Sequence, residues 1–357
     1  MGIGDVAFVQ NRDDGAGYLR DLQNSKYVMS TEPLVSIVCV TYQHKEFIGR
    51  ALDGFLSQRT NFPFEIIVHD DASKDGTVEV ILDYQSRHPD KIFSILQKEN
   101  QRSKGIKPWP PCFEKARGKY IAVCEGDDHW LDVEKLQRQI DALEKDERAT
   151  GCFTNAYNEL RGVRKPFLDE QTNAFVGNTL NEGEYAKGQG IPTCTFCFRK
   201  AEIAGYKELV RNFASGDTAL FTLLLTKGHF IYQPFFTAVR VMHPGGVYSL
   251  QGTMQHLRVA LRNLPEQDKL TQGRFKQQFE ARRMYWLQRS WHEGFNGHNW
   301  PLARLAWSHL RKRRAQMGWS FQRTLWYGFF VHYPELVMNL VKVKHRVFGG
   351  GVASEKE

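Results

Sequence analysis

The sequence of 357 residues lacks any uninterrupted apolar run of the roughly 18 residues that a membrane-spanning helix requires. The best candidate, 325–343, is broken by His332, Pro334, Glu335, Asn339 and Lys342. The first 32 residues are polar, and no apolar core of signal-peptide length follows the initial Met. We therefore expect a cytoplasmic protein.

Cysteine is sparse, and its distribution does not predict a disulfide framework. The six cysteines lie at positions 39, 112, 124, 152, 194 and 197, several of them inside apolar runs. This pattern is typical of reduced, buried thiols. Cys194 and Cys197 have a two-residue spacing, but no second cysteine pair or histidine cluster accompanies them to complete a zinc site.

Positive charge is scarce in the first part of the chain and concentrated in the last. The net charge is +8, and residues 250–357 hold 18 Lys and Arg against 7 Asp and Glu. That segment therefore sums to +11, which leaves −3 for residues 1–249. The basic character therefore belongs to the C-terminal part and not to the rest of the chain.

Short apolar runs alternate with amphipathic segments after residue 33. The runs that predict buried strands are 34–40, 64–69, 92–96 and 120–124. The segments with helical spacing are 46–58, 77–87 and 131–147. This alternation predicts an α/β fold, with a mostly parallel central sheet and helices on both faces. From about residue 251 onward the pattern is helical, aromatic and basic.

Two acidic pairs follow predicted strands. Asp70 and Asp71 end one of them, and Glu125-Gly126-Asp127-Asp128 follows another. The carboxyl ends of parallel strands form the edge at which α/β proteins bind ligands. Adjacent carboxylates also occur in ordinary turns. A hard divalent cation, Mn²⁺ or Mg²⁺, would relieve their repulsion and could bridge them to a diphosphate.

The order of these motifs resembles a known family. The segments that carry the resemblance are Val35-Ser36-Ile37-Val38-Cys39-Val40-Thr41-Tyr42 with His44, residues 51–58, residues 65–77, and residues 118–139 with the Glu125-Gly126-Asp127-Asp128 motif. Over residues 33–250 the chain is similar to family 2 glycosyltransferases. The resemblance implies a GT-A (Rossmann-like) fold, a nucleoside-diphosphate sugar as donor, and inversion at the anomeric carbon.

The resemblance also implies roles for single residues. Asp71 would contact the base, which is uracil in most relatives, and Asp127 would lie near the ribose and the sugar. Asp128 would bind the metal, and Val40, Thr41 and Tyr42 would line the nucleotide pocket. Gln43 departs from the family, where Asn is usual, and we expect it to change the loop and not the chemistry. Residues 100–107 occupy the position of a loop near the donor.

Two further residues are implied downstream. Asp217, in Ser215-Gly216-Asp217, resembles the acid that serves the family as general base at the start of a helix. An acid at this position can also simply stabilise the helix N-terminus. His243 follows the last strand of the domain, where in some relatives a histidine completes the metal shell or approaches the diphosphate. A lone histidine is also often structural, although neutral imidazole is a common metal ligand.

The C-terminal part, 251–357, combines Arg311-Lys312-Arg313-Arg314 with a dense aromatic stretch. A helix is predicted to start at Pro334, with Leu336, Leu340, Val343 and Val347 on one face. Basic residues beside aromatic ones suit an anionic membrane surface. Packing on the preceding domain, or a homo-oligomer interface, explains them equally well. No nucleic acid is expected as a partner.

The sequence therefore predicts a polar extension (1–32), a catalytic domain (33–250) and a helical region (251–357). We expect an inverting hexosyl- or N-acetylhexosaminyltransferase that acts at the cytoplasmic side of a membrane and moves a sugar from a UDP-sugar to a hydroxyl of a glycan or lipid-linked acceptor. The alternative is a non-catalytic sugar-nucleotide-binding or scaffold protein that acts through its basic C-terminal region. A nucleotidyltransferase would need a basic, glycine-rich phosphate loop after the first strand, and residues 41–44 do not form one.

Overall fold

The structure is a computed structural model that describes residues 32–169, 178–246 and 252–336. The predicted extension lies outside these ranges except for Glu32, and so does most of the helix predicted after Pro334. Within the described ranges, no helix is both long enough and apolar enough to cross a bilayer.

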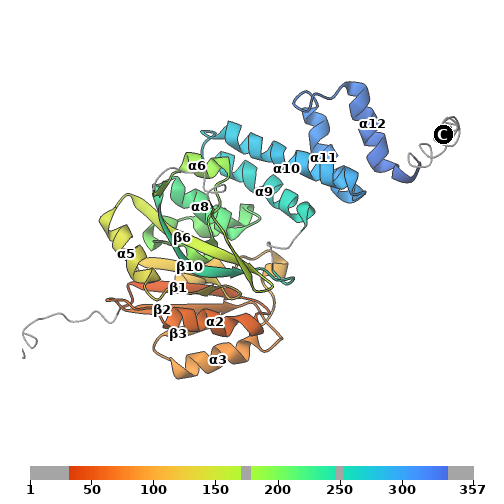
Figure 1. Cartoon of the computed structure of the whole chain (residues 1–357). Coiled ribbons are helices and arrows are strands. Elements are labelled where there is room, and N and C mark those ends of the chain that lie inside the picture. The colour runs from red at the N-terminus through yellow and green to blue at the C-terminus, as the bar shows by residue number, and fades with distance from the viewer. Residues whose placement is uncertain (1–31, 170–177, 247–251, 337–357) are drawn as a thin grey trace, which may run out of the picture.

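A ten-stranded sheet forms the centre of the molecule (Figure 1). Its order is β3-β2-β1-β4-β9-β6-β10-β5, with β7 beside β6 and β8 beside β10. The first four strands are β1 (Val35–Thr41), β2 (Phe64–Asp70), β3 (Ile92–Leu96) and β4 (Tyr120–Glu125), and they pair in parallel. The others are β5 (His129–Trp130), β6 (Ala149–Leu160), β7 (Val163–Pro166), β8 (Thr179–Leu180), β9 (Cys197–Arg199) and β10 (His229–Val241).

The sheet has a hydrophobic core on each face, because successive residues of a strand point to opposite sides. Ile37 of β1 belongs to one core and Val38 to the other. The first core includes residues of α2 (Lys45–Leu56), α3 (Thr77–Arg87) and α5 (Lys135–Lys145). The second includes residues of α4 (Trp109–Lys115), α6 (Glu182–Lys187), α7 (Tyr206–Leu209) and α8 (Gly216–Leu225). The predicted α/β fold with helices on both faces is therefore confirmed.

The sheet is more mixed than the sequence predicted. The long strands β6 and β10 pair in parallel, but the short strands β5, β7, β8 and β9 pair antiparallel with their neighbours. Runs of two to four residues are too short to show a strand period in the sequence. The six cysteines are all buried free thiols, which confirms that prediction.

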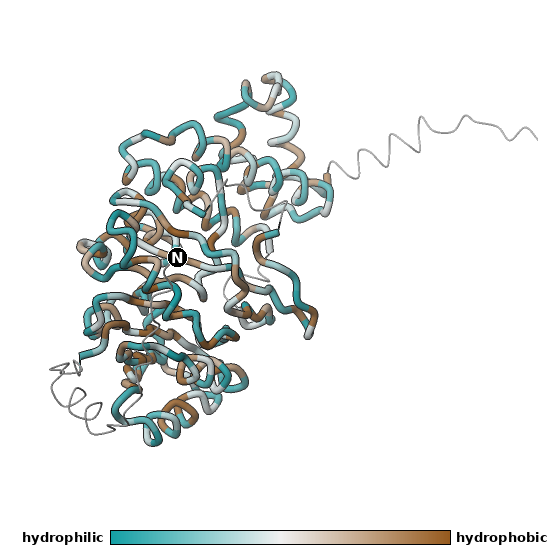
Figure 2. The backbone as a smooth tube through the Cα atoms, turned by 60° about the vertical axis from the view of Figure 1, so that its left-hand side comes forward, coloured by the Kyte–Doolittle hydropathy of each residue, from teal (hydrophilic) through white to brown (hydrophobic). Residues whose placement is uncertain are grey.

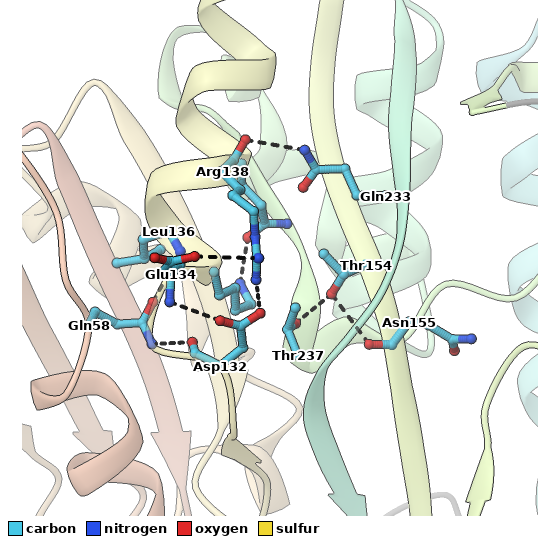
Figure 3. Close-up of polar contacts among 11 residues, drawn as sticks. Gln58, Asp132, Glu134, Leu136, Arg138, Thr154, Asn155, Gln233 and Thr237 are labelled. Atoms are coloured by element: carbon cyan, nitrogen blue, oxygen red, sulfur yellow. Dashed lines mark hydrogen bonds and ion pairs between the residues drawn. The ribbon is translucent and has the colours of Figure 1, made fainter.

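A polar network fixes the segment that follows Asp128 (Figure 3). The side chain of Gln58 donates to the carbonyl of Asp132 at 2.8 Å and accepts the N–H of Leu136 at 3.0 Å. Arg138 forms an ion pair with Asp132, and its carbonyl accepts a hydrogen bond from Gln233 of β10 at 3.2 Å. These bonds join the segment after α2, the start of α5 and the sheet, so the chain that enters α5 is held in place.

The C-terminal helices are α9 (Thr253–Leu270), α10 (Lys276–Asn296), α11 (Trp300–Leu310) and α12 (Phe321–His332). They have a core of their own, which includes Leu257, Leu287, Trp291, Leu302 and Val331. α9 packs on α8, and α10 packs on α6. Figure 1 shows α11 and α12 beyond them, farthest from the sheet. Figure 2 shows both hydrophilic and hydrophobic residues in the helical part of the chain.

Candidate active site

The Glu125-Gly126-Asp127-Asp128 motif turns away from the sheet at the carboxyl ends of β1 and β4. The N–H of Gly126 donates to the carbonyl of Val40 at 2.9 Å, which holds the turn against β1. A Cβ atom at Gly126 would lie 2.7 Å from both Cβ and Oγ1 of Thr41. Only glycine therefore permits this approach, and the turn directs Asp127 and Asp128 to different surroundings.

Asp127 forms a cluster with two histidines from distant parts of the sequence. Its Oδ2 lies 3.0 Å from Nε2 of His243 and 3.8 Å from Nε2 of His44. The potential ligand atoms of the three residues all lie within 4.8 Å of one another. The ring of Phe47 packs against His243 with 4.7 Å between centroids. This His44–Asp127–His243 cluster is the one group of potential metal ligands found in the described part of the chain.

The electrostatics of the cluster favour a negative carboxylate beside a neutral imidazole. Burial alone would raise the pKa of Asp127, but the hydrogen bond with His243 and the nearby His44 lower it. Burial lowers the pKa of His44, and its Nδ1 is buried without a hydrogen-bond partner. A deprotonated carboxylate and neutral imidazole are the forms that bind a metal ion.

Asp128, the predicted metal ligand, lies outside this cluster. It is 5% exposed, and its Oδ1 accepts the N–H of Val241 at the end of β10 at 2.9 Å. Burial, together with the charges of Asp127 and Glu125, raises the pKa of Asp128 well above its ordinary value. In this structure Asp128 therefore fastens the motif to β10, two residues before His243.

Asp217 lies in the first turn of α8, as predicted, and its charge acts on the same motif. Its Oδ1 accepts the N–H of Thr218 at 2.6 Å, while Ser215, the residue at the N-cap, makes no capping bond with its side chain. Burial, followed by the charges of Asp127 and Asp217, raises the pKa of Glu125 to about 8. Asp217 and the acidic motif therefore share one electrostatic environment.

The turn that carries Asp217 is held from outside the predicted catalytic domain. Asn263 of α9 accepts the N–H of Ala214 at 2.7 Å and donates to Oγ of Ser215 at 2.8 Å. On the other side, Nζ of Lys107 donates to the carbonyl of Ala214 at 2.5 Å. Asn263 is 4% exposed, so these bonds are shielded from water. A C-terminal helix thus positions a candidate catalytic residue.

Asp71, the predicted base contact, binds a loop of the chain itself. Its two carboxylate oxygens accept the N–H groups of Gln101 at 2.7 Å and of Arg102 at 3.0 Å. Its own N–H donates to the carbonyl of Thr41 at 3.0 Å. Asp71 therefore joins the end of β1 to residues 100–107, so the predicted pocket residues and the predicted donor loop meet at one carboxylate.

The remaining predicted pocket residues lie at the end of β1. The Oγ1 of Thr41 is buried without a partner, and Tyr42 is 44% exposed. Gln43 has a left-handed φ of 59°, and its side-chain oxygen accepts the N–H of Lys74 at 2.9 Å. This glutamine thus connects the two loops that follow β1 and β2, and it makes no contact with Asp127 or Asp217.

Three residues of the site were not singled out from the sequence. His44 lies in the first motif, just after the end of β1, and this position at a strand end could have marked it as a site residue. Glu125 was treated only as part of its motif, because its pKa depends on neighbours that the fold brings together. Asn263 lies in the middle of a helix, and nothing in its sequence context distinguishes it.

Comparison with known proteins identifies the family to which the chain is similar. The family model described as Glycosyl transferase family 2 matches residues 36–205. Uncharacterized protein Rv1520 of Mycobacterium tuberculosis is 42% identical over 120 residues, which are 33% of this chain and 34% of that protein. The chain therefore matches about a third of the length of this relative.

Two other similar proteins have names that state an activity. UDP-Glc:alpha-D-GlcNAc-diphosphoundecaprenol beta-1,3-glucosyltransferase WfaP of Escherichia coli is 34% identical over 217 residues, covering 50% of this chain and 83% of WfaP. The mannosyltransferase PcManGT of Pyrobaculum calidifontis, solved in complex with GDP-Man and Mn²⁺, has a TM-score of 0.53 at 14% identity. That match covers 92% of this chain and 87% of PcManGT. At this identity the second similarity concerns the fold alone.

Proposed function

The chain belongs to glycosyl transferase family 2, and from this membership we propose that it transfers a sugar from a nucleoside-diphosphate sugar to an acceptor hydroxyl, with inversion. The observation that carries the proposal is the His44–Asp127–His243 cluster at the motif that follows β4. Asp217 lies near enough to Glu125 of the same motif for its charge to raise the pKa of that carboxyl. The His44–Asp127–His243 cluster suits binding of the donor diphosphate through a metal ion, and the Asp217 carboxylate suits deprotonation of the acceptor hydroxyl.

The proposed donor is a UDP-sugar that carries a hexose or an N-acetylhexosamine. Val40, Thr41, Tyr42 and Asp71 would form the nucleotide pocket. Asp71 has both oxygens near backbone N–H groups, and each oxygen keeps a free lone pair for a base N–H. The name of WfaP, which specifies UDP-Glc, supports this choice.

The chemistry of the cluster fits a divalent metal. It offers one carboxylate and two imidazoles, and the buried Nδ1 of His44 lacks any partner. Mg²⁺ prefers oxygen ligands, so two imidazoles favour Mn²⁺ over Mg²⁺. We propose His44, Asp127 and His243 as the residues that hold it. Asp128, which the family resemblance implies as the ligand, is the alternative. The bound cation would supply positive charge that stabilises the diphosphate leaving group.

Asp217 is the proposed general base. As the acceptor oxygen attacks the anomeric carbon, a carboxylate oxygen of Asp217 takes the proton of that hydroxyl. The N–H of Thr218 donates to Oδ1, which orients the carboxylate and leaves Oδ2 available. Asn263 and Lys107 hold the preceding backbone through Ala214, so the base is fixed relative to the motif.

The acceptor is proposed to be a glycan or a lipid-linked sugar at the cytoplasmic side of a membrane. WfaP acts, by its name, on a sugar linked to diphosphoundecaprenol. Residues 33–250 would provide the donor site, and α9 of the 251–357 region would complete the support of the base.

The test measures UDP release and donor binding in wild type, in Asp217→Asn and in a matched control, Asp83→Asn, which replaces an exposed acid of α3. A screen of nucleotide-sugars by thermal shift, with and without Mn²⁺, first identifies the donor. We expect Asp217→Asn to keep donor stabilisation and to lose transfer by about 10²–10⁴-fold. Unchanged transfer would remove Asp217 from its role. No stabilisation of the wild type by any donor would favour a non-catalytic scaffold.

A further inference from the structure

Helix α12 has two apolar faces, and only one of them is used in packing. Thr324, Gly328 and Val331 are buried on the side that meets α11. A Cβ atom at Gly328 would lie 2.4 Å from Cζ2 of Trp307, so the two helices are in close contact there. This face gives α12 its place in the C-terminal core.

The other face of α12 exposes large apolar side chains. Four of them lie within the helix and two just after it: Phe321 (60% exposed), Leu325 (56%), Trp326 (51%), Phe329 (38%), Tyr333 (58%) and Leu336 (52%). Phe321, Leu325 and Phe329 are four residues apart, which places them on one side of the helix. The rings of Phe329 and Tyr333 are 5.3 Å apart, so the apolar surface continues past the helix end. We call these six residues the α12 stripe.

Positive charge surrounds the α12 stripe. Residues 311–334 contain five Lys and Arg and no Asp or Glu. Arg311, Lys312, Arg314 and Arg323 are exposed, and the guanidinium of Arg314 lies 5.2 Å from the ring centroid of Phe321. Basic side chains are thus positioned directly beside the apolar ones. Figure 1 shows α12 at the end of the molecule that is farthest from the sheet.

We propose that α12 is a docking surface for an anionic lipid bilayer. The aromatic and aliphatic side chains of the stripe would enter the interfacial region, and the basic side chains would contact lipid phosphates. Amphipathic aromatic rings are favoured at that depth. Residues 311–336 contain five Lys and Arg and one acid, Glu335, so a symmetric contact with a second copy would bring two net-positive surfaces together, which electrostatic repulsion disfavours. The inference is independent of the chemistry proposed for the active site.

The experiment is sedimentation of the full chain with vesicles of phosphatidylcholine, alone or mixed with phosphatidylglycerol. We expect binding only to the anionic vesicles and weakening by added salt. The double variant Leu325→Gln/Phe329→Gln should bind at least about 10-fold more weakly, because it removes apolar area from the membrane side. Tyr285→Gln, an aromatic residue of α10 that is 55% exposed and outside the stripe, is the matched control and should bind like wild type.

Thermal melting and UDP release of the double variant, measured with a water-soluble acceptor, should match wild type, because neither side chain is buried in the core or near the site. Four outcomes would overturn the proposal. These are no binding of wild type to anionic vesicles, equal binding by the double variant, binding gained only when residues 337–357 are removed, and a dimer in light scattering that the double variant loses.

Discussion

Asp127 and Asp128 are adjacent in sequence, yet the fold gives them different partners. Asp127 faces two histidines, whereas Asp128 is bonded to the backbone of Val241. We therefore predict that Asp127→Asn abolishes the stabilisation of the protein by Mn²⁺, because a neutral amide is a poor metal ligand. Asp128→Asn should keep most of it, since an amide oxygen can still accept the N–H of Val241. Thermal shift with MnCl₂ alone checks both, and the reverse pattern would make Asp128 the ligand.

Lys135 is a buried cation at the start of α5. It is fully buried, its Nζ donates to Oε1 of Gln139 at 2.6 Å, and it lies 4.1 Å from the ring centroid of Trp130. Burial lowers the pKa of Lys135 below its ordinary 10.5. Unfolding then takes up a proton between the lowered value and 10.5, so this lysine makes the stability of the wild type rise with pH in that window.

Lys135→Met should remove that dependence. The variant is expected to gain most, relative to wild type, below the lowered pKa, and the difference should shrink as the pH approaches 10.5. The change removes a buried charge but leaves Gln139 with an unmet acceptor worth about 1–3 kcal/mol, so the net effect near neutral pH is small. Urea unfolding from pH 7 to 10 measures it. A difference that does not vary with pH would mean that the fold does not lower the pKa of Lys135 into this range.

Sequence patterns predicted the residues of the site better than their contacts. Asp71, Asp127, Asp217 and His243 all lie at strand ends or a helix start, and the local pattern marks such positions. The pairing of His243 with Asp127 depends on side-chain directions after two strands that are more than 100 residues apart, and no local pattern encodes it.

At the scale of elements, the loop at 99–107 depends on one side chain. Both oxygens of Asp71 accept backbone N–H groups of this loop. Asp71→Ala should therefore release it and increase trypsin cleavage after Arg102 and Lys104, while Asp71→Asn, which keeps one acceptor oxygen, should have an intermediate effect. Glu99→Ala is the control, because Glu99 makes only an exposed ion pair with Lys104. Equal cleavage of wild type and Asp71→Ala would contradict this role.

Helix α9 supports the turn before α8 through Asn263. Asn263→Ala removes two buried hydrogen bonds, so we expect a loss of about 1–3 kcal/mol of stability together with a fall in kcat and little change in the donor KM. Asn263→Asp keeps the acceptor for the N–H of Ala214 and should recover part of kcat. Arg258→Ala, on the exposed side of α9, is the control. A variant that loses stability but keeps kcat would show that Asn263 is only structural.

The elements themselves follow from the sequence to different degrees. The predicted strand 64–69 became β2, because a short apolar run fits a strand that is buried on both faces. The predicted helix 77–87 became α3 with the same bounds, because its apolar residues have helical spacing. Helix α5 begins at Lys135 and not at Leu131, since Gln58 accepts the N–H of Leu136 and holds the preceding residues in a turn. That bond spans 78 positions and is not visible in the local sequence.

For the whole molecule, the sequence predicted an α/β domain followed by helices but did not predict how the two are joined. The structure packs α9 and α10 on α8 and α6, whereas α11 and α12 extend the helical core. The two explanations offered for this region, packing on the domain and contact with a membrane, therefore apply to different helices. α9 packs on the catalytic domain through α8, whereas α12 has an exposed apolar face that can contact a membrane.

The six buried thiols are distributed unevenly, and this makes them reporters of one part of the molecule. They occur in β1, α4, β4, β6 and β9 and next to β9, and none lies after Cys197. A thiol reagent such as an aromatic disulfide can reach them only when the sheet opens, so the rate of labelling follows the opening of the sheet and not that of the C-terminal helices. Slower labelling in the presence of a nucleotide-sugar would measure how strongly the donor stabilises the sheet against opening. The native cysteines suffice for this measurement, so no cysteine has to be introduced.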